Sequence, residues 1–129
     1  MPYVHFVIAL ALIQFFYFGL QVGQARGRYK VAAPATTGDE IFERYFRVQM
    51  NTLEQLVLFV PAILIFAQYW SPYIAAGAGG VYLVGRLLYF FSYVKDPKKR
   101  ELGYAVTVIP IAFLVGGAIV GALRAMFYM

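Results

Sequence analysis

The stretch "QLVLFVPAILIFAQYWSPYIAAGAGGVYLVG", residues 55–85, contains no acidic or basic side chain. A transmembrane helix needs roughly 20 apolar residues, so this run is longer than one crossing requires. The motif "WSPY" at 70–73 interrupts the run with a serine and a proline, which favour a turn. The stretch therefore predicts two membrane-spanning helices joined by a short turn.

Two further segments have the same character. Residues 4–25 contain no charged side chain apart from the titratable His5, and residues 102–123 contain none. The chain is 62% hydrophobic and only 13% charged, which lies outside the range of ordinary soluble domains. These continuous apolar runs do not alternate as barrel strands do, so they predict helices. We expect an all-α integral membrane protein, a four-helix bundle forming one domain over 1–129, with helices at about 3–25, 40–70, 73–95 and 101–127.

The basic residues predict the orientation in the membrane. They gather around the first connection (Arg26, Arg28, Lys30, Arg44, Arg47) and the third connection (Lys95, Lys98, Lys99, Arg100). By the positive-inside rule, both connections face the cytoplasm, and the two termini and the 70–73 turn lie on the opposite side. The net charge of +5 is explained in this way without a nucleic-acid partner. The chain has no cysteine and one histidine, so we expect no metal site.

A polar face runs along the second expected helix, in "ERYFRVQMNTLE" at 43–54. Glu43, Arg47, Asn51 and Glu54 recur at helical spacing and so share one face. Each would cost about 2–3 kcal/mol or more if it pointed at lipid deep in the bilayer, so the face must meet protein, water or a polar ligand. Two interpretations stay open at this point: an ion-pair network at the helix end, or a ligand site.

A second polar set lies on the third expected helix, where "GRLLYFFSY" at 85–93 places Arg86, Tyr89 and Tyr93 on one face. An unpaired arginine inside an apolar segment would be very unfavourable. Glu54 is the only acid at a similar depth, so we predict a structural ion pair between Arg86 and Glu54.

The fourth expected helix begins near "KDPKKRELGY" at 95–104, which places Arg100 and Tyr104 one turn apart. All these polar elements converge at the cytoplasmic boundary. Cations, an amide, a carboxylate and phenols together suit a small zwitterion with several carboxylates. The predicted pocket consists of Arg47, Asn51, Glu54, Tyr89, Tyr93 and Arg100, with Arg26 at the end of the first helix.

Two blocks of the chain resemble the family of membrane-associated proteins in eicosanoid and glutathione metabolism (MAPEG). "TTGDEIFERYFRVQMNTLE" at 36–54 resembles the family signature E-R-x-x-R-[AV]-[QH]-x-N-x-x-E, and "VYLVGRLLYFFSYVKDPKKRELGY" at 81–104 is similar to the third-helix region of family members. The resemblance implies a homotrimer of four-helix subunits that binds glutathione at the subunit interfaces, facing the cytoplasm.

The resemblance also implies roles for individual residues. Arg100 matches the catalytic arginine, which would favour the thiolate of glutathione. The implied activity is glutathione transfer to a lipophilic electrophile, with reduction of lipid hydroperoxides as a related reaction. Gly27 and Gln55 depart from the pattern of some members, which puts one acid role and one glutathione contact in doubt. The implied glutathione contacts are Arg26, Arg47, Gln49, Asn51, Glu54, Tyr89 and Tyr93.

A different class of function remains as the alternative. One member of the same family is a noncatalytic trimeric scaffold that binds membrane lipid, and it lacks charged positions of the signature. Arg47, Glu54 and Arg100 are all present in this chain. Their presence favours the enzyme over the scaffold.

Overall fold

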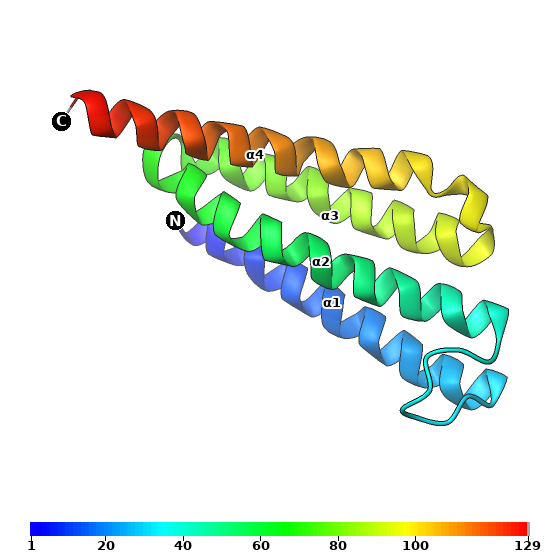
Figure 1. Cartoon of the computed structure of the whole chain (residues 1–129). Coiled ribbons are helices and arrows are strands. Elements are labelled where there is room, and N and C mark those ends of the chain that lie inside the picture. The colour runs from blue at the N-terminus through cyan, green and yellow to red at the C-terminus, as the bar shows by residue number, and fades with distance from the viewer. Residues whose placement is uncertain (129) are drawn as a thin grey trace.

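The computed structural model of the chain describes residues 1–128 and consists of four long helices (Figure 1). Met129, the last residue of the predicted domain, lies outside the described residues. All four helices are long and apolar enough to cross a membrane, so the predicted all-α multi-pass membrane fold is confirmed. The elements are α1 (Pro2–Tyr29), α2 (Glu40–Tyr69), α3 (Pro72–Lys95), the 3-10 helix η1 (Pro97–Lys99) and α4 (Glu101–Tyr128).

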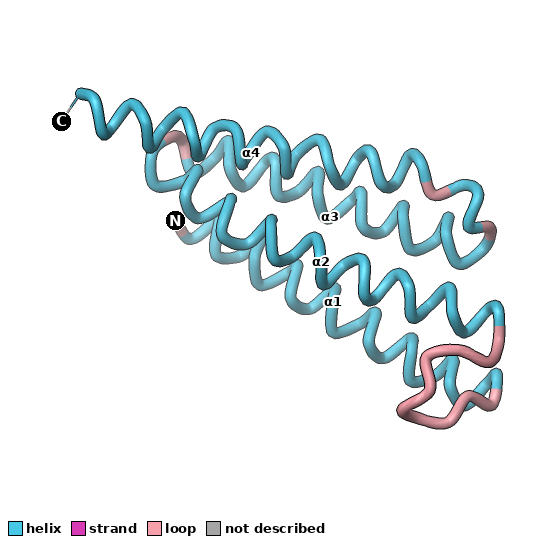
Figure 2. The backbone as a smooth tube through the Cα atoms, viewed as in Figure 1, coloured by secondary structure: helices cyan, strands magenta, loops and turns pink. Residues whose placement is uncertain are grey.

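The helices run up and down along one common axis. Figure 2 shows that the loops lie at the two ends of the bundle, with the long α1–α2 loop and the α3–α4 connection at the same end. The short α2–α3 turn and both termini lie at the other end (Figure 1). The pair α1–α2 and the pair α3–α4 splay apart toward the end that carries the two longer connections (Figure 1).

Local sequence signals explain where the helices begin. An Asp39 Oδ1 atom accepts hydrogen bonds from the backbone N–H groups of Ile41 and Phe42, each at 2.9 Å, and so caps α2. Ser71 caps α3 in the same manner, and Pro72 occupies the first helical position, where a missing N–H has no cost. The turn predicted from "WSPY" is therefore built from a cap and a proline. The observed α1 extends to Tyr29, further than the predicted end near residue 25.

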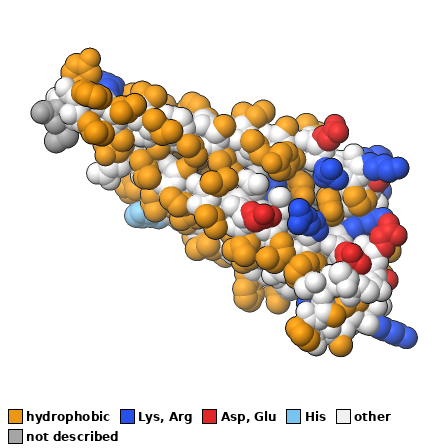
Figure 3. Space-filling view, in the orientation of Figure 1, with side chains coloured by type: hydrophobic (Ala, Val, Ile, Leu, Met, Phe, Trp, Pro, Cys, Tyr) orange, Lys and Arg blue, Asp and Glu red, His pale blue; other side chains and the backbone are white. Residues whose placement is uncertain are grey.

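Apolar side chains fill the bundle interior and also cover most of its outer surface. Phe59 and Tyr82 stack at the centre with ring centroids 4.0 Å apart, next to Ile63 and Leu114. In the space-filling view, hydrophobic side chains cover the length of the molecule, whereas most charged side chains gather at the end with the two longer connections (Figure 3). This distribution suits a protein whose middle lies in hydrocarbon and whose charged end reaches water.

Helices α3 and α4 make backbone-to-backbone contact near the charged end. A Cβ atom at Gly85 would lie 2.7 Å from the backbone N of Thr107, and one at Gly103 would collide with the backbone of Tyr89. Small residues permit this close approach, which is a common way for membrane helices to associate. The contact fixes the start of α4 against α3, and α4 begins with Glu101, directly after Arg100.

Candidate functional site

A cleft of about 470 Å³ opens between α2, α3 and the beginning of α4 at the charged end of the bundle. It contains five of the side chains that the sequence predicts for the site, together with Glu101 and Tyr104 from the first turn of α4. The cleft is lined by Arg47, Asn51, Tyr89, Tyr93, Arg100, Glu101 and Tyr104.

Each side chain reaches the cleft because of its place on a regular element. Arg47 and Asn51 are one turn apart on α2, and Tyr89 and Tyr93 are one turn apart on α3, with ring centroids 5.4 Å apart. Arg100 follows η1 directly, and its Nη1 lies 3.4 Å from the Pro97 carbonyl oxygen. The cleft is therefore supported by two rigid helices and by the short connection between α3 and α4.

The cleft carries an excess of positive charge. Among residues 1–128, the structure contains one ion pair between side chains, which joins Glu40 and Arg44 at 3.2 Å. Neither Arg47 nor Arg100 has a carboxylate within 4 Å in this part of the chain, and Glu101 is the one acid that lines the cleft. Two guanidinium groups against one carboxylate favour an anionic ligand, and a guanidinium can bind a carboxylate through two parallel hydrogen bonds.

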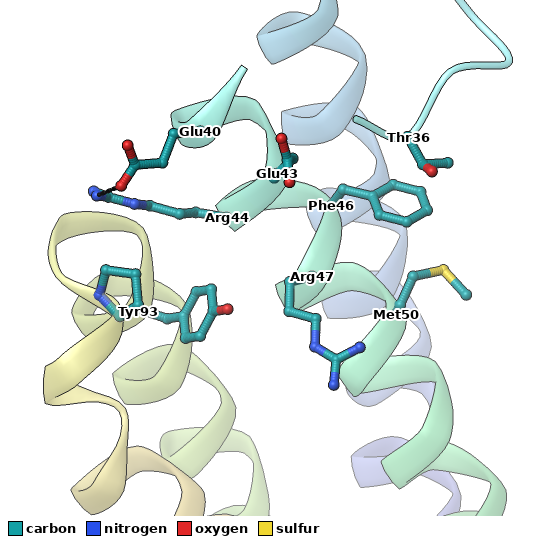
Figure 4. Close-up of a pocket in the computed structure, with 9 residues that line it drawn as sticks. Thr36, Glu40, Glu43, Arg44, Phe46, Arg47, Met50 and Tyr93 are labelled. Carbon is teal, nitrogen blue, oxygen red and sulfur yellow. Dashed lines mark hydrogen bonds and ion pairs between the residues drawn. The ribbon is translucent and has the colours of Figure 1, made fainter. Parts of the chain in front are cut away.

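A second cleft of about 340 Å³ adjoins the first at Arg47 and Tyr93. Figure 4 shows the Tyr93 ring pointing from α3 toward α2, and the Arg47 side chain running along α2 away from Glu43. The second cleft thus extends the polar space toward the start of α2. Its lining residues are Thr36, Glu40, Glu43, Arg44, Phe46, Arg47, Met50, Tyr93 and Pro97.

The structure corrects the predicted ion pair between Arg86 and Glu54. Arg86 is 0% exposed, and its Nη1 donates to Asn51 Oδ1 at 2.7 Å and to Thr52 Oγ1 at 3.1 Å, while its Nε donates to Thr107 Oγ1 at 3.1 Å. Glu54 is exposed and is not among the partners of Arg86. The prediction was wrong because it considered only a charged partner, whereas three neutral oxygens on α2 and α4 accept from the guanidinium.

The two threonines can accept from Arg86 because their own protons are used elsewhere. The Thr52 hydroxyl donates to the Val48 carbonyl oxygen at 2.7 Å, and the Thr107 hydroxyl donates to the Gly103 carbonyl oxygen at 2.8 Å. Each hydroxyl oxygen therefore presents a lone pair to the guanidinium. This arrangement ties α2, α3 and α4 together directly behind the cleft.

Arg86 also supports two residues that line the cleft. Its guanidinium carbon lies 4.5 Å from the centroid of the Tyr89 ring, within the range of a cation–π contact. It holds the oxygen of the Asn51 side chain, which leaves the two N–H donors of that amide for other partners. Arg86 is therefore a positioning residue for Tyr89 and Asn51.

Three of the predicted site residues lie outside this cleft. The Arg26 Nη1 donates to the Ala35 carbonyl oxygen at 2.7 Å, and its guanidinium lies 4.9 Å from the centroid of the Phe42 ring. Gln49 lies against Gly19 of α1. Glu54 is exposed and does not line the cleft. The expected set thus divides between the cleft and other surfaces of α1 and α2.

Sequence reasoning missed the roles of Glu101, Thr52 and Thr107. Glu101 directly follows Arg100, so its position at the start of a helix offered a signal. Thr107 is the single threonine in the apolar run at 102–123, and it lies seven residues, or about two helical turns, after Arg100. A search for neutral acceptors at that spacing would have found it.

Comparison with known proteins establishes the class. The chain matches the MAPEG family over residues 4–120 and therefore belongs to this family. It is 45% identical over 117 residues to an uncharacterized protein of Synechocystis sp., a match that covers 91% of this chain and 85% of the relative.

Two further relatives have names that describe an activity. Microsomal glutathione S-transferase 2 of Homo sapiens is 41% identical over 108 residues, covering 84% of this chain and 74% of the relative. Leukotriene C4 synthase of Bos taurus is 36% identical over 107 residues, covering 83% of this chain and 71% of the relative. The sequence-based identification of the family is thereby confirmed.

Proposed function

We propose that the protein is a membrane-bound glutathione transferase that activates the glutathione thiolate for attack on lipophilic electrophiles. The observation that carries the proposal is the cleft in which Arg47 and Arg100 lie together with Asn51 and Tyr93, without a carboxylate within 4 Å of either arginine in residues 1–128. The relatives named glutathione S-transferase and leukotriene C4 synthase support the same chemistry.

Glutathione matches the groups that the cleft offers. The tripeptide carries two carboxylates, one amine, amide groups and one thiol. In the proposal Arg47 binds a carboxylate, the Asn51 N–H donors bind a peptide carbonyl, and the hydroxyl groups of Tyr89 and Tyr93 add hydrogen bonds. Glu54 lies outside the cleft, one turn after Asn51 on α2, and in the proposal it accepts from the amine where the ligand extends past the cleft edge. No metal takes part in the proposed reaction.

Arg100 supplies the activation. A free thiol has a pKa of about 8.5, so only a few per cent is thiolate at neutral pH, and the thiolate is the nucleophile. A guanidinium beside the sulfur favours the anion. If Arg100 lowers the pKa of the bound thiol by about two units, the differential stabilisation is about 2.7 kcal/mol.

The reaction then proceeds at the edge of the membrane. The thiolate sulfur forms a bond to an electrophilic carbon, and the leaving group departs with the electron pair of the broken bond. In an addition, the electron pair moves onto the substrate, which takes up a proton. With a lipid hydroperoxide, two glutathione molecules become a disulfide while the hydroperoxide is reduced to an alcohol and water. Each reaction begins from the same thiolate.

The proposal includes a homotrimer with its glutathione sites facing the cytoplasm. Arg26 and Gln49 lie away from the cleft of their own chain, on the side of α1. A neighbouring subunit that packs there would bring these two side chains to the next cleft. The basic residues around the two longer connections support a cytoplasmic position for this end of the bundle in the proposal, by the positive-inside rule. Native mass spectrometry of the detergent-solubilised protein tests the number of subunits.

The thiolate absorbance of glutathione in the ultraviolet tests the activity directly. We expect a thiolate signal when glutathione is mixed with the purified protein at neutral pH, and about a hundredfold lower thiolate-to-thiol ratio in Arg100→Ala. Lys99→Ala is the matched control, because Lys99 is an exposed neighbour that does not line the cleft. No thiolate in the folded wild-type protein would overturn the transferase and favour the noncatalytic lipid-binding scaffold.

A further inference from the structure

The end of the bundle away from the cleft holds an isolated cation. Arg124 is the only basic residue beyond Arg100, and it lies near the end of α4. Its guanidinium carbon lies 5.3 Å from the centroid of the Trp70 ring. Within residues 1–128 it has no carboxylate within 4 Å. Arg124 therefore presents a positive charge beside an aromatic surface, at the level where tryptophan and tyrosine meet the membrane interface.

Two hollows meet at Trp70. The first, of about 270 Å³, is lined by Arg124 together with Tyr69 and Tyr128. The second, of about 710 Å³, is an apolar groove that includes Phe66, Phe113 and Gly116. Trp70 lines both hollows. A polar hollow and an apolar groove therefore lie on either side of one shared residue, Trp70.

The structure also explains why the groove stays open. The indole N–H of Trp70 donates to the Gly117 carbonyl oxygen at 2.8 Å, which fixes the ring across the two hollows. The Phe66 ring packs directly on Gly117, so α2 lies close to α4 there. A Cβ atom at Gly116, by contrast, would have nothing within 4 Å. Gly116 therefore forms an unfilled floor of the groove.

The dimensions match one leaflet of a bilayer. From Phe113 to Arg124 α4 rises by about 16 Å, at 1.5 Å per residue. Half of a hydrocarbon core that is about 30 Å thick is about 15 Å. A molecule with an anionic head at Arg124 would therefore place its chain alongside Phe66 and Phe113, down to the middle of the membrane.

We propose that these two hollows form a binding site for one anionic glycerophospholipid of the leaflet opposite the glutathione cleft. Its phosphate pairs with Arg124 and the neighbouring tyrosine hydroxyls of Tyr69 and Tyr128, and one acyl chain occupies the groove over Gly116. Charge complementarity at Arg124 selects the anionic head, and the apolar compartment selects a lipid over free phosphate. The site is independent of the proposed transferase activity.

Fluorescence of Trp70 tests the site, because Trp70 is the single tryptophan of the chain. The full-length protein is placed in phosphatidylcholine nanodiscs that contain a varied fraction of a lipid with brominated chains, which quench tryptophan at contact. In one series the brominated lipid is phosphatidylglycerol, and in the other it is phosphatidylcholine. We expect brominated phosphatidylglycerol to reach half-maximal quenching at a mole fraction about threefold or more below that of brominated phosphatidylcholine. Inorganic phosphate at millimolar concentration should leave the quenching unchanged.

Variants separate the head from the chain. Arg124→Gln should abolish the preference for the anionic lipid, Arg124→Lys should retain most of it, and Lys98→Gln should leave it intact as a charge control at the other end. Gly116→Leu should reduce quenching by both lipids, whereas Gly77→Leu, also at a position where a Cβ meets nothing, should not. Helical content by circular dichroism checks that each variant is folded.

Three outcomes would overturn the proposal. Equal quenching of the wild-type protein by both brominated lipids would mean that Trp70 contacts bulk membrane lipid without selectivity for the head group. Absence of quenching by either lipid would mean that another protein surface, such as a second copy of the chain, covers Trp70. Loss of quenching on addition of inorganic phosphate would mean a site for the free anion.

Discussion

The two ends of the bundle differ in how their helices meet. At the cleft end, long polar side chains connect the helices: Arg86 joins α3 to Asn51 of α2, and the Arg44 Nη1 donates to the Val94 carbonyl oxygen at 3.1 Å. At the other end aromatic rings lie on glycines, as Phe66 does on Gly117. Both ends are helical and both lie at a membrane boundary, but α2 is separated from α3 by side chains at the cleft end, whereas α2 is closely packed on α4 at the other end.

This difference follows from the forces available in a membrane. Lipid tails are as apolar as leucine, so helices associate through close packing of small residues or through interhelical hydrogen bonds. Hydrogen bonding by long side chains leaves room for a polar ligand between α2 and α3, and the ring of Phe66 on Gly117 leaves none between α2 and α4 at that point. The cleft at the charged end therefore depends on the hydrogen bonds of Arg86 with α2 and α4. The close backbone contacts at Gly85 and Gly103 hold α4 in the position that these hydrogen bonds require.

The largest effect is expected from Gly103→Val. A side chain at position 103 would collide with the backbone of Tyr89, and a backbone cannot turn aside as a side chain can. We expect a loss of more than about 3 kcal/mol in stability, at or beyond the upper end for overpacked cores, or failure to fold. Gly80→Val is the control, because a Cβ there meets nothing within 4 Å. Thermal unfolding in a fixed detergent measures both. Equal midpoints would show that α3 and α4 do not need backbone contact.

A smaller effect is expected from Thr107→Val, which removes one acceptor of the buried Arg86 while keeping the side-chain shape. The Arg86 Nε–H group would then be buried without a partner, at a cost of about 1–3 kcal/mol. Thr107→Ser keeps the hydroxyl and should stay within about 1 kcal/mol of the wild type. Unfolding midpoints in detergent compare the three proteins. If the valine and serine variants were equally stable, the neutral acceptors would not be what holds Arg86.

Most of the fold was predictable from the sequence, because a continuous apolar run of sufficient length indicates a membrane helix. The uncharged stretch 55–85 and its "WSPY" interruption indicated α2, α3 and the turn between them, as observed at Glu40–Tyr69 and Pro72–Lys95. Helical periodicity also placed Arg47 and Asn51 on one face, and both line the cleft. The spacing of polar residues along a helix and the hydropathy of a segment are local properties, so both can be read from a single sequence.

The partners across helices were less predictable, because they depend on tertiary packing. The prediction paired Arg86 with the acid at similar depth, whereas the structure surrounds it with Asn51, Thr52 and Thr107. Which threonine faces the arginine depends on the rotation of α4, and Gly85 and Gly103 set this rotation through close contact. Neither position has a side chain whose character would suggest such a role.

A third effect compares two adjacent glycines at the closely packed end. A Cβ atom at Gly117 would collide with the Phe66 ring, and Phe66 is buried, so Gly117→Ala should destabilise the protein by about 1–2 kcal/mol. Gly116→Ala meets nothing and should be neutral or stabilising, since alanine is the better helix former. Unfolding midpoints in one detergent measure the difference. The same midpoint for both variants would indicate that glycine packing contributes little at this end.

The smallest effect compares the caps at the two ends. The Asp39 carboxylate accepts two hydrogen bonds of 2.9 Å at the start of α2, near the cleft, whereas the Ser71 hydroxyl accepts at 3.2 and 3.4 Å at the start of α3. A charged acceptor also interacts favourably with the positive end of the helix. Asp39→Ala should therefore cost about 1 kcal/mol, and Ser71→Ala should cost less.

Hydrogen exchange of the amide groups measures these caps locally. Exchange at Ile41 and Phe42 should accelerate in Asp39→Ala by about fivefold, the factor that corresponds to about 1 kcal/mol, with little change in α3. The reciprocal change in Ser71→Ala should be confined to Tyr73 and Ile74. A larger loss from the serine cap would reverse the ranking, because it would mean that the closely packed end depends on its cap more than the cleft end does.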